Sequence, residues 1–161
     1  MVNPAIIEYN NRVFIITDSP KTDTIEQYID FYNSRGVKTV VRLCEPLYDC
    51  SVLQNSGINL IDMPFPDGTT PDTIIVEKWL EIIANNKENL LAIHCLSGLG
   101  RAPVLVGISL IELGMEKLET IEFIREKRYG ALNLRQLQFI MNYNPRKLEN
   151  QNLCKLFSCF R

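Results

Sequence analysis

The sequence predicts a single α/β domain with a central, mostly parallel sheet flanked by helices. Strand-like and helix-like segments alternate as far as residue 94, three further helix-like segments follow, and the length of 161 residues suits one domain. Residues 1–144 are expected to form this domain, and residues 145–161 a weakly basic and apolar C-terminal tail.

The expected strands are short apolar runs, several of them rich in β-branched residues. The first run ends in the turn signal Asp18-Ser19-Pro20, and the last leads into a glycine-rich turn. The runs cover residues 13–17, 37–43, 58–61 and 89–94.

Apolar residues at spacings of three and four predict the helices. The first opens at Thr22-Asp23-Thr24 and closes at Gly36, and the second opens at Pro71-Asp72. Gly114 and Gly130 separate the remaining helical segments. These cover residues 101–113, 117–128 and 133–143.

Composition excludes several classes of protein. Seventeen Lys and Arg against nineteen Asp and Glu give a net charge of −2, which does not favour binding to nucleic acid. Five cysteines without a Cys-x-x-Cys pair, beside one histidine, argue against a disulfide scaffold and a zinc site. We find no secretory signal, and the longest apolar run, residues 104–111, is too short to span a bilayer. A cytoplasmic domain is expected.

The stretch from Ala92 to Arg101 carries the chemistry. A strand delivers Cys95 into a tight loop that contains Gly98 and Gly100, and Arg101 begins a helix six residues after the cysteine. The backbone N–H groups of Leu96, Ser97, Gly98, Leu99, Gly100 and Arg101 can converge on one anion beside the helix N-terminus. Such a setting lowers a cysteine pKa from about 8.5 to roughly 3.5–7.5. A nucleophile and an anion site in one loop predict attack on a phosphoryl centre.

Each of these residues also has a simpler interpretation. A single cysteine at the end of a buried strand is usually a small apolar residue, but packing does not require an arginine at this spacing. His94 is not expected to be the base for Cys95, because adjacent strand residues point to opposite faces. It is expected to brace the loop by hydrogen bonding. No metal or cofactor is needed.

The loop resembles the signature of the cysteine-based protein phosphatases, and the wider sequence is most similar to the phosphatase of regenerating liver group, protein tyrosine phosphatase type IVA. The resemblance covers about residues 6 to 143 and implies a dual-specificity-like phosphatase fold. Its most specific motifs outside Cys95–Gly98 are Val40-Val41-Arg42-Leu43-Cys44-Glu45, Pro64-Phe65-Pro66-Asp67-Gly68, Gly98-Leu99-Gly100-Arg101-Ala102-Pro103-Val104-Leu105-Val106 and Phe123-Ile124-Arg125-Glu126-Lys127-Arg128.

The general acid is expected at Asp67, because expelling an alkoxide or phenoxide needs a proton donor and Asp67 matches the family's acid position. The alternative is that Asp67-Gly68 is only a turn. The family usually has Trp where this chain has Met63, and an acidic residue just before the general acid where this chain has Pro66. The dynamics of this loop, and any partner contact made through that acidic residue, are therefore expected to differ.

Two further residues take their roles from the resemblance. Ala102 follows the loop arginine where most relatives in the superfamily have Ser or Thr, which implies slow hydrolysis of a phosphocysteine. Cys44 matches the cysteine that pairs with the nucleophile when the enzyme is oxidised, and a buried structural thiol is the alternative.

Glu45 and Arg128 resemble family positions near the pocket, although charged residues of this kind are more commonly exposed on the surface. Gln136 lies where related phosphatases can hold a glutamine that positions water, and a residue on a helix surface is the expected case.

The C-terminal segment from Arg146 to Arg161 has four basic residues against Glu149. Family members usually carry a prenylated cysteine four residues from the end, and this chain has Ser158 there. The segment is expected to pack on the domain as a terminal helix. The alternative is palmitoylation of Cys154 or Cys159, or a short amphipathic contact that makes the protein peripheral at a membrane.

The sequence therefore predicts a phosphoric monoester hydrolase that acts on tyrosine or with dual specificity on phosphoproteins, through a phosphocysteine. The alternative is a phosphate-pocket binding module, a pseudophosphatase-like regulator of a membrane transporter. For this role the resemblance implies partners among cyclin-M-type magnesium transport mediators. A thiol oxidoreductase or arsenate reductase using Cys95 and Cys44 is a weaker alternative, since arsenate reductases usually carry this loop near the N-terminus.

Overall fold

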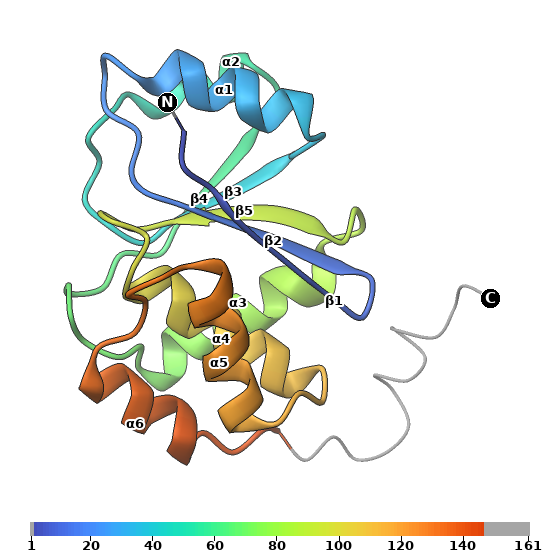
Figure 1. Cartoon of the computed structure of the whole chain (residues 1–161). Coiled ribbons are helices and arrows are strands. Elements are labelled where there is room, and N and C mark those ends of the chain that lie inside the picture. Colours follow the sequence, from blue (N-terminus) through green and yellow to red (C-terminus); the bar gives the residue numbers. More distant parts are fainter. Residues whose placement is uncertain (1, 147–161) are drawn as a thin grey trace.

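A twisted sheet runs through the middle of the molecule in the computed structural model, which describes residues 2–146 (Figure 1). Within that range the sheet has five strands in the order β1-β2-β5-β3-β4. Strands β2, β5, β3 and β4 are parallel, and β1 pairs with β2 in the antiparallel direction. The strands are β1 (Ala5–Tyr9), β2 (Arg12–Thr17), β3 (Thr39–Arg42), β4 (Asn59–Asp62) and β5 (Leu90–His94).

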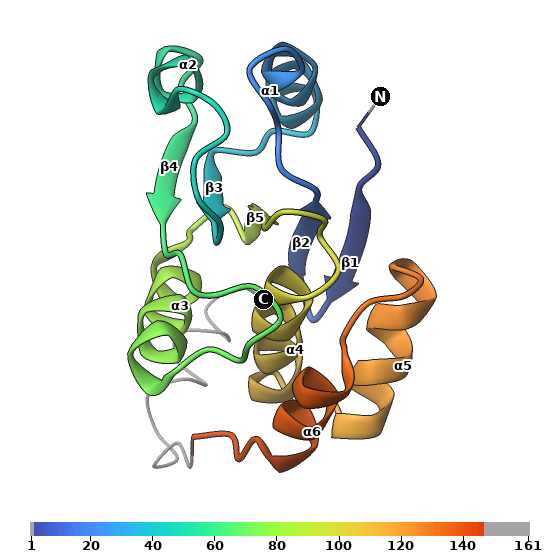
Figure 2. The same cartoon turned by 90° about the vertical axis from the view of Figure 1, so that its left-hand side faces the viewer.

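Helices cover both faces of the sheet (Figure 2). Helices α1 and α2 lie on one face, and α3 to α6 lie on the other. This arrangement confirms the predicted α/β class with a mostly parallel sheet. The helices are α1 (Ile25–Ser34), α2 (Cys50–Asn55), α3 (Thr73–Asn85), α4 (Arg101–Glu112), α5 (Lys117–Lys127) and α6 (Leu134–Asn142).

Each face of the sheet has its own apolar core. Leu91 and Ile93 of β5 pack into the larger core with α3, α4, α5 and α6, while Ala92 between them packs into the smaller core with α1 and α2. This alternation is the two-residue period of a strand buried on both faces. It also places His94 on the side of α1 and α2, where its ring lies 5.8 Å from that of Tyr48.

Two elements were not predicted from the sequence. Strand β1 forms a hairpin with β2 through Asn10 and Asn11, whose φ angles of 45° and 61° are those of a tight two-residue hairpin turn. Helix α2 has six residues, too few for an apolar period, and it starts where the Asp49 side chain accepts a hydrogen bond from the Ser51 N–H.

The last described residues lie against α4. The backbone N–H of Arg146 donates to Glu112 Oε1 at 3.0 Å, and the Tyr143 hydroxyl donates to the same oxygen. Residues 147–161 are outside the described part of the chain, so the expectations for Cys154, Cys159 and the rest of the tail fall there.

Candidate active site

The C-terminal ends of β5 and β3 meet at one edge of the sheet, where ligands bind in parallel α/β sheets. Cys95 directly follows β5, and Arg101 opens α4 six residues later. Beside them lies a cavity of about 460 Å³. Its lining is largely apolar and includes Cys44, Glu45, Leu47, Pro64, Phe65, Pro66, Asp67, Leu96 and Arg101.

Residues 95–101 form the phosphate loop, and the carbonyls of the first five of them are bound by groups outside the loop. His94 Nδ1 lies 3.2 Å from the Cys95 carbonyl, and the Ser19 N–H donates to the Leu96 carbonyl at 3.0 Å. The Arg128 guanidinium donates to the Ser97 carbonyl at 2.9 Å and to the Gly98 carbonyl at 3.3 Å. The Leu132 N–H completes the set with a 2.8 Å bond to the Leu99 carbonyl.

These contacts orient the amides of the loop. In a trans peptide the C=O of one residue and the N–H of the next point in opposite directions. Because five successive carbonyls are bound by surrounding residues, the N–H groups of the residues that follow them point the other way, toward the interior of the loop. Those residues are Leu96, Ser97, Gly98, Leu99 and Gly100, five of the six that the sequence analysis selected for binding an anion.

Gly98 is required by both its conformation and its surroundings. Its φ of 71° lies in the left-handed region, and a Cβ there would stand 2.6 Å from the Thr17 carbonyl oxygen and 2.7 Å from Arg128 Nη2. Because Gly98 has no side chain, the Arg128 guanidinium comes close enough to the loop to bind two of its carbonyls. Gly100 leaves room for the Gln136 amide, which a Cβ would approach to 3.0 Å.

Arg101 lies between the phosphate loop and residues 64–70, the acid loop. Its Nη1 donates to the carbonyls of Leu43 and Phe65, both at 3.0 Å. Its Nε lies 3.2 Å from Asp67 Oδ1, an ion pair without the alignment of a hydrogen bond. The arginine side chain is 7% exposed, whereas the Asp67 side chain is 67% exposed. The structure thus brings together two of the three residues predicted to be catalytic, the buried Arg101 and the exposed Asp67. Cys95 is also buried, at the other end of the phosphate loop, next to the cavity-lining residue Leu96.

His94 ends β5 and Cys44 follows β3, and their side chains lie next to each other. Burial lowers the pKa of His94 to about 4, so the imidazole is neutral at pH 7. Cys44 is 5% exposed; its Sγ is 3.8 Å from Ser19 Oγ and 4.0 Å from His94 Nδ1. Burial raises the pKa of the Cys44 thiol, and the Ser19 contact and the charge of Arg101 partly oppose this effect. Ala102 is fully buried in the first turn of α4.

Two residues that resemble family positions near the pocket, but for which exposure was the favoured expectation, are buried parts of the site. Arg128 is 8% exposed and, besides its bonds to the phosphate loop, donates to the Asn3 carbonyl ahead of β1. Gln136 is fully buried; its Nε2 donates to the Thr69 carbonyl at 3.1 Å and its Oε1 accepts from the Asn133 N–H. The spacing Asn133-x-x-Gln136 is that of a capping box, which was the available sequence signal for the second of these positions.

Comparisons with known proteins agree with this geometry. A family model described as "Polymorphic toxin system, DSP-PTPase phosphatase" matches residues 17–115. The chain is 45% identical to the PRL-1 phosphatase of Drosophila melanogaster, over 92% of this chain and 88% of the relative. It is 40% identical to the human protein tyrosine phosphatase type IVA 3, over 89% of this chain and 86% of that protein.

The chain belongs to the protein tyrosine phosphatase type IVA family. It is a protein tyrosine phosphatase, a phosphoric monoester hydrolase in the dual-specificity group of cysteine phosphatases. A solved structure described as a putative protein tyrosine phosphatase from Leishmania major superposes with a TM-score of 0.78 at 34% identity, covering 88% of this chain and 99% of that one.

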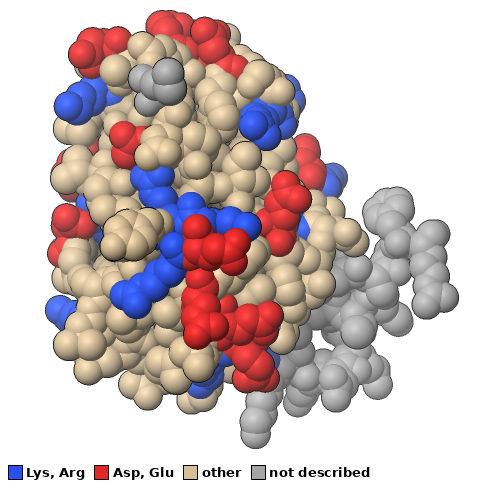
Figure 3. Space-filling model, viewed as in Figure 1, with Lys and Arg blue, Asp and Glu red and all other residues tan. Residues whose placement is uncertain are grey.

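The surface of this type IVA phosphatase mixes charges of both signs. In Figure 3, Lys and Arg side chains gather in the middle of one face and are bordered by Asp and Glu side chains. Such alternation does not create a uniform basic field on that face. Within residues 2–146 we find no helix with the length and apolar character needed to cross a membrane.

Proposed function

We propose that Cys95 is the nucleophile, that Arg101 and the phosphate-loop amides bind the phosphoryl oxygens, and that Asp67 is the general acid. The Cys95 thiolate attacks phosphorus, the S–P bond forms and the P–O bond to the leaving group breaks. The departing oxygen takes the proton of the Asp67 carboxyl group. Water then attacks the phosphocysteine, its proton passes to the Asp67 carboxylate, and the S–P bond breaks.

The observation that carries this proposal is the binding of five loop carbonyls by groups outside the loop. It supports an anion site with amides fixed in place before the substrate arrives, so that little reorganisation is needed as charge develops. Because Arg101 Nη1 is used by two carbonyls, we assign the Nε and Nη2 edge of the guanidinium to the phosphate. Binding there displaces the Asp67 carboxylate from Nε, and the exposed side chain is free to turn toward the leaving group.

The decisive experiment is hydrolysis of aryl phosphates under reducing conditions. Cys95→Ser is expected to abolish turnover. Asp67→Asn is expected to lower kcat by about 10²–10³ for an alkyl-like leaving group and much less for a nitrophenolate, which leaves without a proton. Glu45→Gln is the matched control, a carboxyl-to-amide change on the same cavity wall. Activity that survives Cys95→Ser would contradict the assignment.

Slow hydrolysis of the phosphocysteine is the proposed consequence of Ala102. The methyl side chain is fully buried in the first turn of α4 and has no hydroxyl to assist the departing thiolate. A burst of one equivalent of phenolate followed by a slower steady rate is expected, and Ala102→Ser should raise the steady rate. An unchanged rate in that variant would contradict this role.

We further propose that Cys44 forms a disulfide with Cys95 under oxidation. Peroxide converts the Cys95 thiolate to sulfenic acid, and the Cys44 thiol attacks that sulfur, forming the S–S bond and releasing water. The burial of both thiols at the same end of the sheet supports this step. Mass spectrometry after mild peroxide treatment should find the linked peptides. Sulfonic acid on Cys95 without a linkage would contradict the proposal.

A binding role for the same pocket is the second candidate. The Arg101–Asp67 ion pair supports it, because the guanidinium accepts a carboxylate where we place the phosphate. An acidic segment of a transporter of the cyclin-M type, the partner implied by family resemblance, would compete with Asp67 for that position. Binding of such a segment that persists in Cys95→Ser, with no Cys95-dependent turnover in the wild type, would favour the binding role.

We infer a cytoplasmic protein whose phosphatase domain spans residues 1–144 and whose tail makes peripheral contact with membranes if it is acylated. The free thiols of Cys44, Cys50 and Cys95 support a reducing compartment. Metabolic labelling with a palmitate analogue, compared between wild type and the double variant Cys154→Ser/Cys159→Ser, tests the tail. Equal labelling of the two proteins would contradict acylation at these cysteines.

A further inference from the structure

Exposed leucine side chains gather around the candidate active site. Among residues 2–146 five leucines are exposed, with exposed fractions from 37% for Leu99 to 71% for Leu134. Four of the five belong to segments that form or contact the cavity, and the fifth is Leu118 of α5. The four, which we call the apolar rim, are Leu47, Leu96, Leu99 and Leu134. Single exposed leucines are ordinary, but a group of them beside one cavity marks a surface that meets an apolar partner.

Three residues of the rim belong to the cavity lining and the phosphate loop. Leu47, in the segment between β3 and α2, and Leu96 of the phosphate loop both line the cavity. Leu99 follows three residues later in the same loop. The phosphate-binding role that we assign to Leu96 and Leu99 uses only their backbone N–H groups, which every residue except proline supplies. Their exposed side chains are therefore available for another task.

Leu134 reaches the same region from the start of α6. Two residues earlier, the Leu132 N–H donates to the Leu99 carbonyl at 2.8 Å. Asn133, the residue between them, donates from Nδ2 to the Gly68 carbonyl of the acid loop at 3.1 Å. The chain just before Leu134 thus lies between the phosphate loop and the acid loop, so Leu134 extends the rim beyond the cavity lining.

A peptide substrate has to cross this rim. The protein is a protein tyrosine phosphatase, and a phosphotyrosine whose phosphate lies at Arg101 has its side chain in the cavity. An extended chain advances about 3.3–3.6 Å per residue, so the residues on either side of the phosphotyrosine stay close to the cavity mouth. Apolar side chains at those positions would remove the rim leucines from water, which stabilises the complex.

The charges of the lining favour the same kind of substrate. Among the described residues that line the cavity, Arg101 is the only basic one, and we assign its guanidinium to the phosphate. The exposed carboxylate of Asp67 belongs to the same lining. An acidic residue next to the phosphotyrosine would therefore meet a like charge, whereas an apolar residue would meet leucine.

We propose that the apolar rim is a docking surface for the substrate and that it selects phosphotyrosine flanked by large apolar residues. This inference names the substrate class of the proposed active site, and it rests on the proposed placement of the phosphate at Arg101 and the phosphate loop. The selection comes from side chains that the chemical step does not use, so it acts on substrate affinity.

The test measures the affinity of three peptides that cannot be hydrolysed. Each carries a difluorophosphonomethyl-phenylalanine, in which a CF₂ group replaces the ester oxygen, and its two neighbours are both Leu, both Ala or both Glu. For the wild type we expect calorimetry to give a Kd for the Leu peptide about tenfold lower than for the Ala peptide, the effect of burying a few methylene groups. The Glu peptide should bind most weakly.

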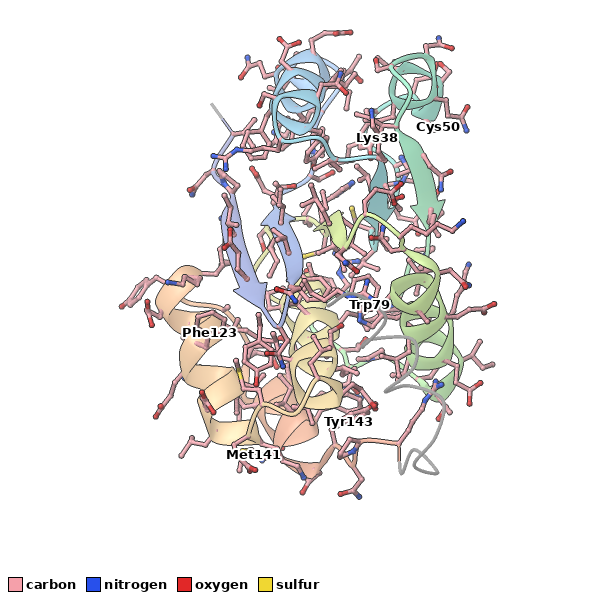
Figure 4. The ribbon with its side chains drawn as sticks, turned by 90° about the vertical axis from the view of Figure 1, so that its right-hand side faces the viewer. Lys38, Cys50, Trp79, Phe123, Met141 and Tyr143 are labelled. Carbon is pink, nitrogen blue, oxygen red and sulfur yellow. The ribbon has the colours of Figure 1, made fainter. Side chains whose placement is uncertain are left out.

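Two double variants decide whether the rim is the cause. Leu47→Ser/Leu134→Ser removes two rim side chains, and the ratio of the Ala-peptide Kd to the Leu-peptide Kd should fall from about tenfold to below about threefold. The matched control Leu118→Ser/Met141→Ser removes two apolar side chains that are exposed elsewhere, and it should keep the ratio. Lys117, beside Leu118, donates to the Met141 carbonyl at 3.0 Å, and Figure 4 shows Met141 at the lower end of the helical layer, away from the sheet.

A third variant separates this inference from the proposed phosphate site. Arg101→Lys keeps the charge but loses the planar guanidinium, so it should weaken the binding of all three peptides to the same degree. Peptide affinities that do not change in Arg101→Lys would contradict the placement of the phosphate. The Kd ratio reports on the rim, and binding without turnover does not depend on the role of Cys95. Thermal unfolding shows that each variant is folded.

Equal affinity of the wild type for the Leu and Ala peptides would overturn the proposal, and so would an equal loss of selectivity in the two double variants. An unchanged Kd ratio in Leu47→Ser/Leu134→Ser would overturn it as well. If that variant also lost binding to phosphatidylserine vesicles, the rim would be assigned to a lipid surface instead.

Discussion

The two loops that face the candidate active site are held in different ways. The phosphate loop, residues 95–101, has five successive carbonyls bound by four residues from three other parts of the chain: the end of β5, the segment after β2, and the connection between α5 and α6. In the acid loop, residues 64–70, the Asp67 side chain is 67% exposed. The backbone of the acid loop accepts two hydrogen bonds from the start of α6, both at 3.1 Å. Asn133 Nδ2 donates to the Gly68 carbonyl, and Gln136 Nε2 donates to the Thr69 carbonyl.

The difference corresponds to the two tasks. An anion site stabilises developing charge best when its donors are already oriented, and dense external bonding of the phosphate loop provides this. A proton donor has to approach and leave with the substrate, which suits a loop with fewer restraints. Arg101 connects the two loops, because it binds the Phe65 carbonyl and Asp67 while its backbone belongs to the phosphate loop.

The largest expected effect follows from breaking the phosphate loop at Gly98. In Gly98→Ala the new methyl group would overlap the Thr17 carbonyl and Arg128, and the residue would be strained at a φ of 71°. We expect a loss of about 3–5 kcal/mol in the free energy of unfolding and of more than 100-fold in aryl phosphatase activity. Gly36→Ala has a similar φ of 74° with no atom within 4 Å, so it isolates the backbone strain, about 1 kcal/mol. Equal losses in the two variants would show that contact with the loop is not the cause.

Removing the outer support of the phosphate loop should have the next largest effect. Arg128→Ala loses the bonds to Ser97 and Gly98 and the bond to Asn3, and we expect a loss of about 2–3 kcal/mol in the free energy of unfolding together with lower kcat. Arg35→Ala, an exposed arginine of the α1 C-cap, is the control and should change stability by less than about 0.5 kcal/mol. Wild-type kcat in Arg128→Ala would contradict the idea that the loop is held from outside.

The support from His94 should appear as a dependence of stability on pH. Burial lowers the His94 pKa to about 4, against about 6.5 in the unfolded chain. Between these values the unfolded chain binds a proton that the folded protein does not, so stability falls as pH falls. From pH 7 to pH 5 this residue should cost about 2 kcal/mol in urea unfolding. His94→Asn should be less sensitive to pH by that amount, and an identical pH dependence in both proteins would refute the assignment.

The smallest effect is expected in the acid loop. Asn133→Ser keeps a side chain that can cap α6 but is too short to reach the Gly68 carbonyl. We expect kcat for an alkyl-like phosphate to fall only a few-fold, with the free energy of unfolding unchanged within about 0.5 kcal/mol. A loss as large as that of Arg128→Ala would show that both loops depend equally on outside support, and the contrast between them would be lost.

Local patterns were sufficient to predict most of the fold. The predicted strand at residues 13–17 corresponds to β2, and the predicted helix at 117–128 corresponds to α5, with ends that differ by one residue. The helix buries one face, so its apolar residues recur every three or four positions, and the buried strand is a short continuous apolar run. Both patterns can be recognised in the sequence. Strand β1 was missed because its pairing with β2 depends on Asn10 and Asn11 adopting positive φ, which asparagine tolerates but does not require.

The catalytic candidates divide in the same way. Cys95 and Arg101 belong to one contiguous motif between a strand and a helix, so their relation could be predicted without knowing the fold. Arg128 and Gln136 lie 27 and 35 residues beyond Arg101, outside that motif, and charge and polarity alone favoured an exposed position for both. Their burial depends on how α5 and α6 pack beside the phosphate loop, where the loop carbonyls and the Thr69 carbonyl are the acceptors that compensate for the loss of water.

By itself, the sequence determined the α/β class, the family and the loop that carries Cys95, because each is written in local periodicity or contiguous motifs. Only the tertiary structure decided how that loop is held. The partners of its carbonyls are His94 at the end of β5, Ser19 after β2, and Arg128 and Leu132 between α5 and α6. These parts of the chain meet only when the sheet and helices pack. The orientation of Tyr48 toward His94 is of the same kind, since a hydrogen bond between residues 46 positions apart is a property of the folded chain.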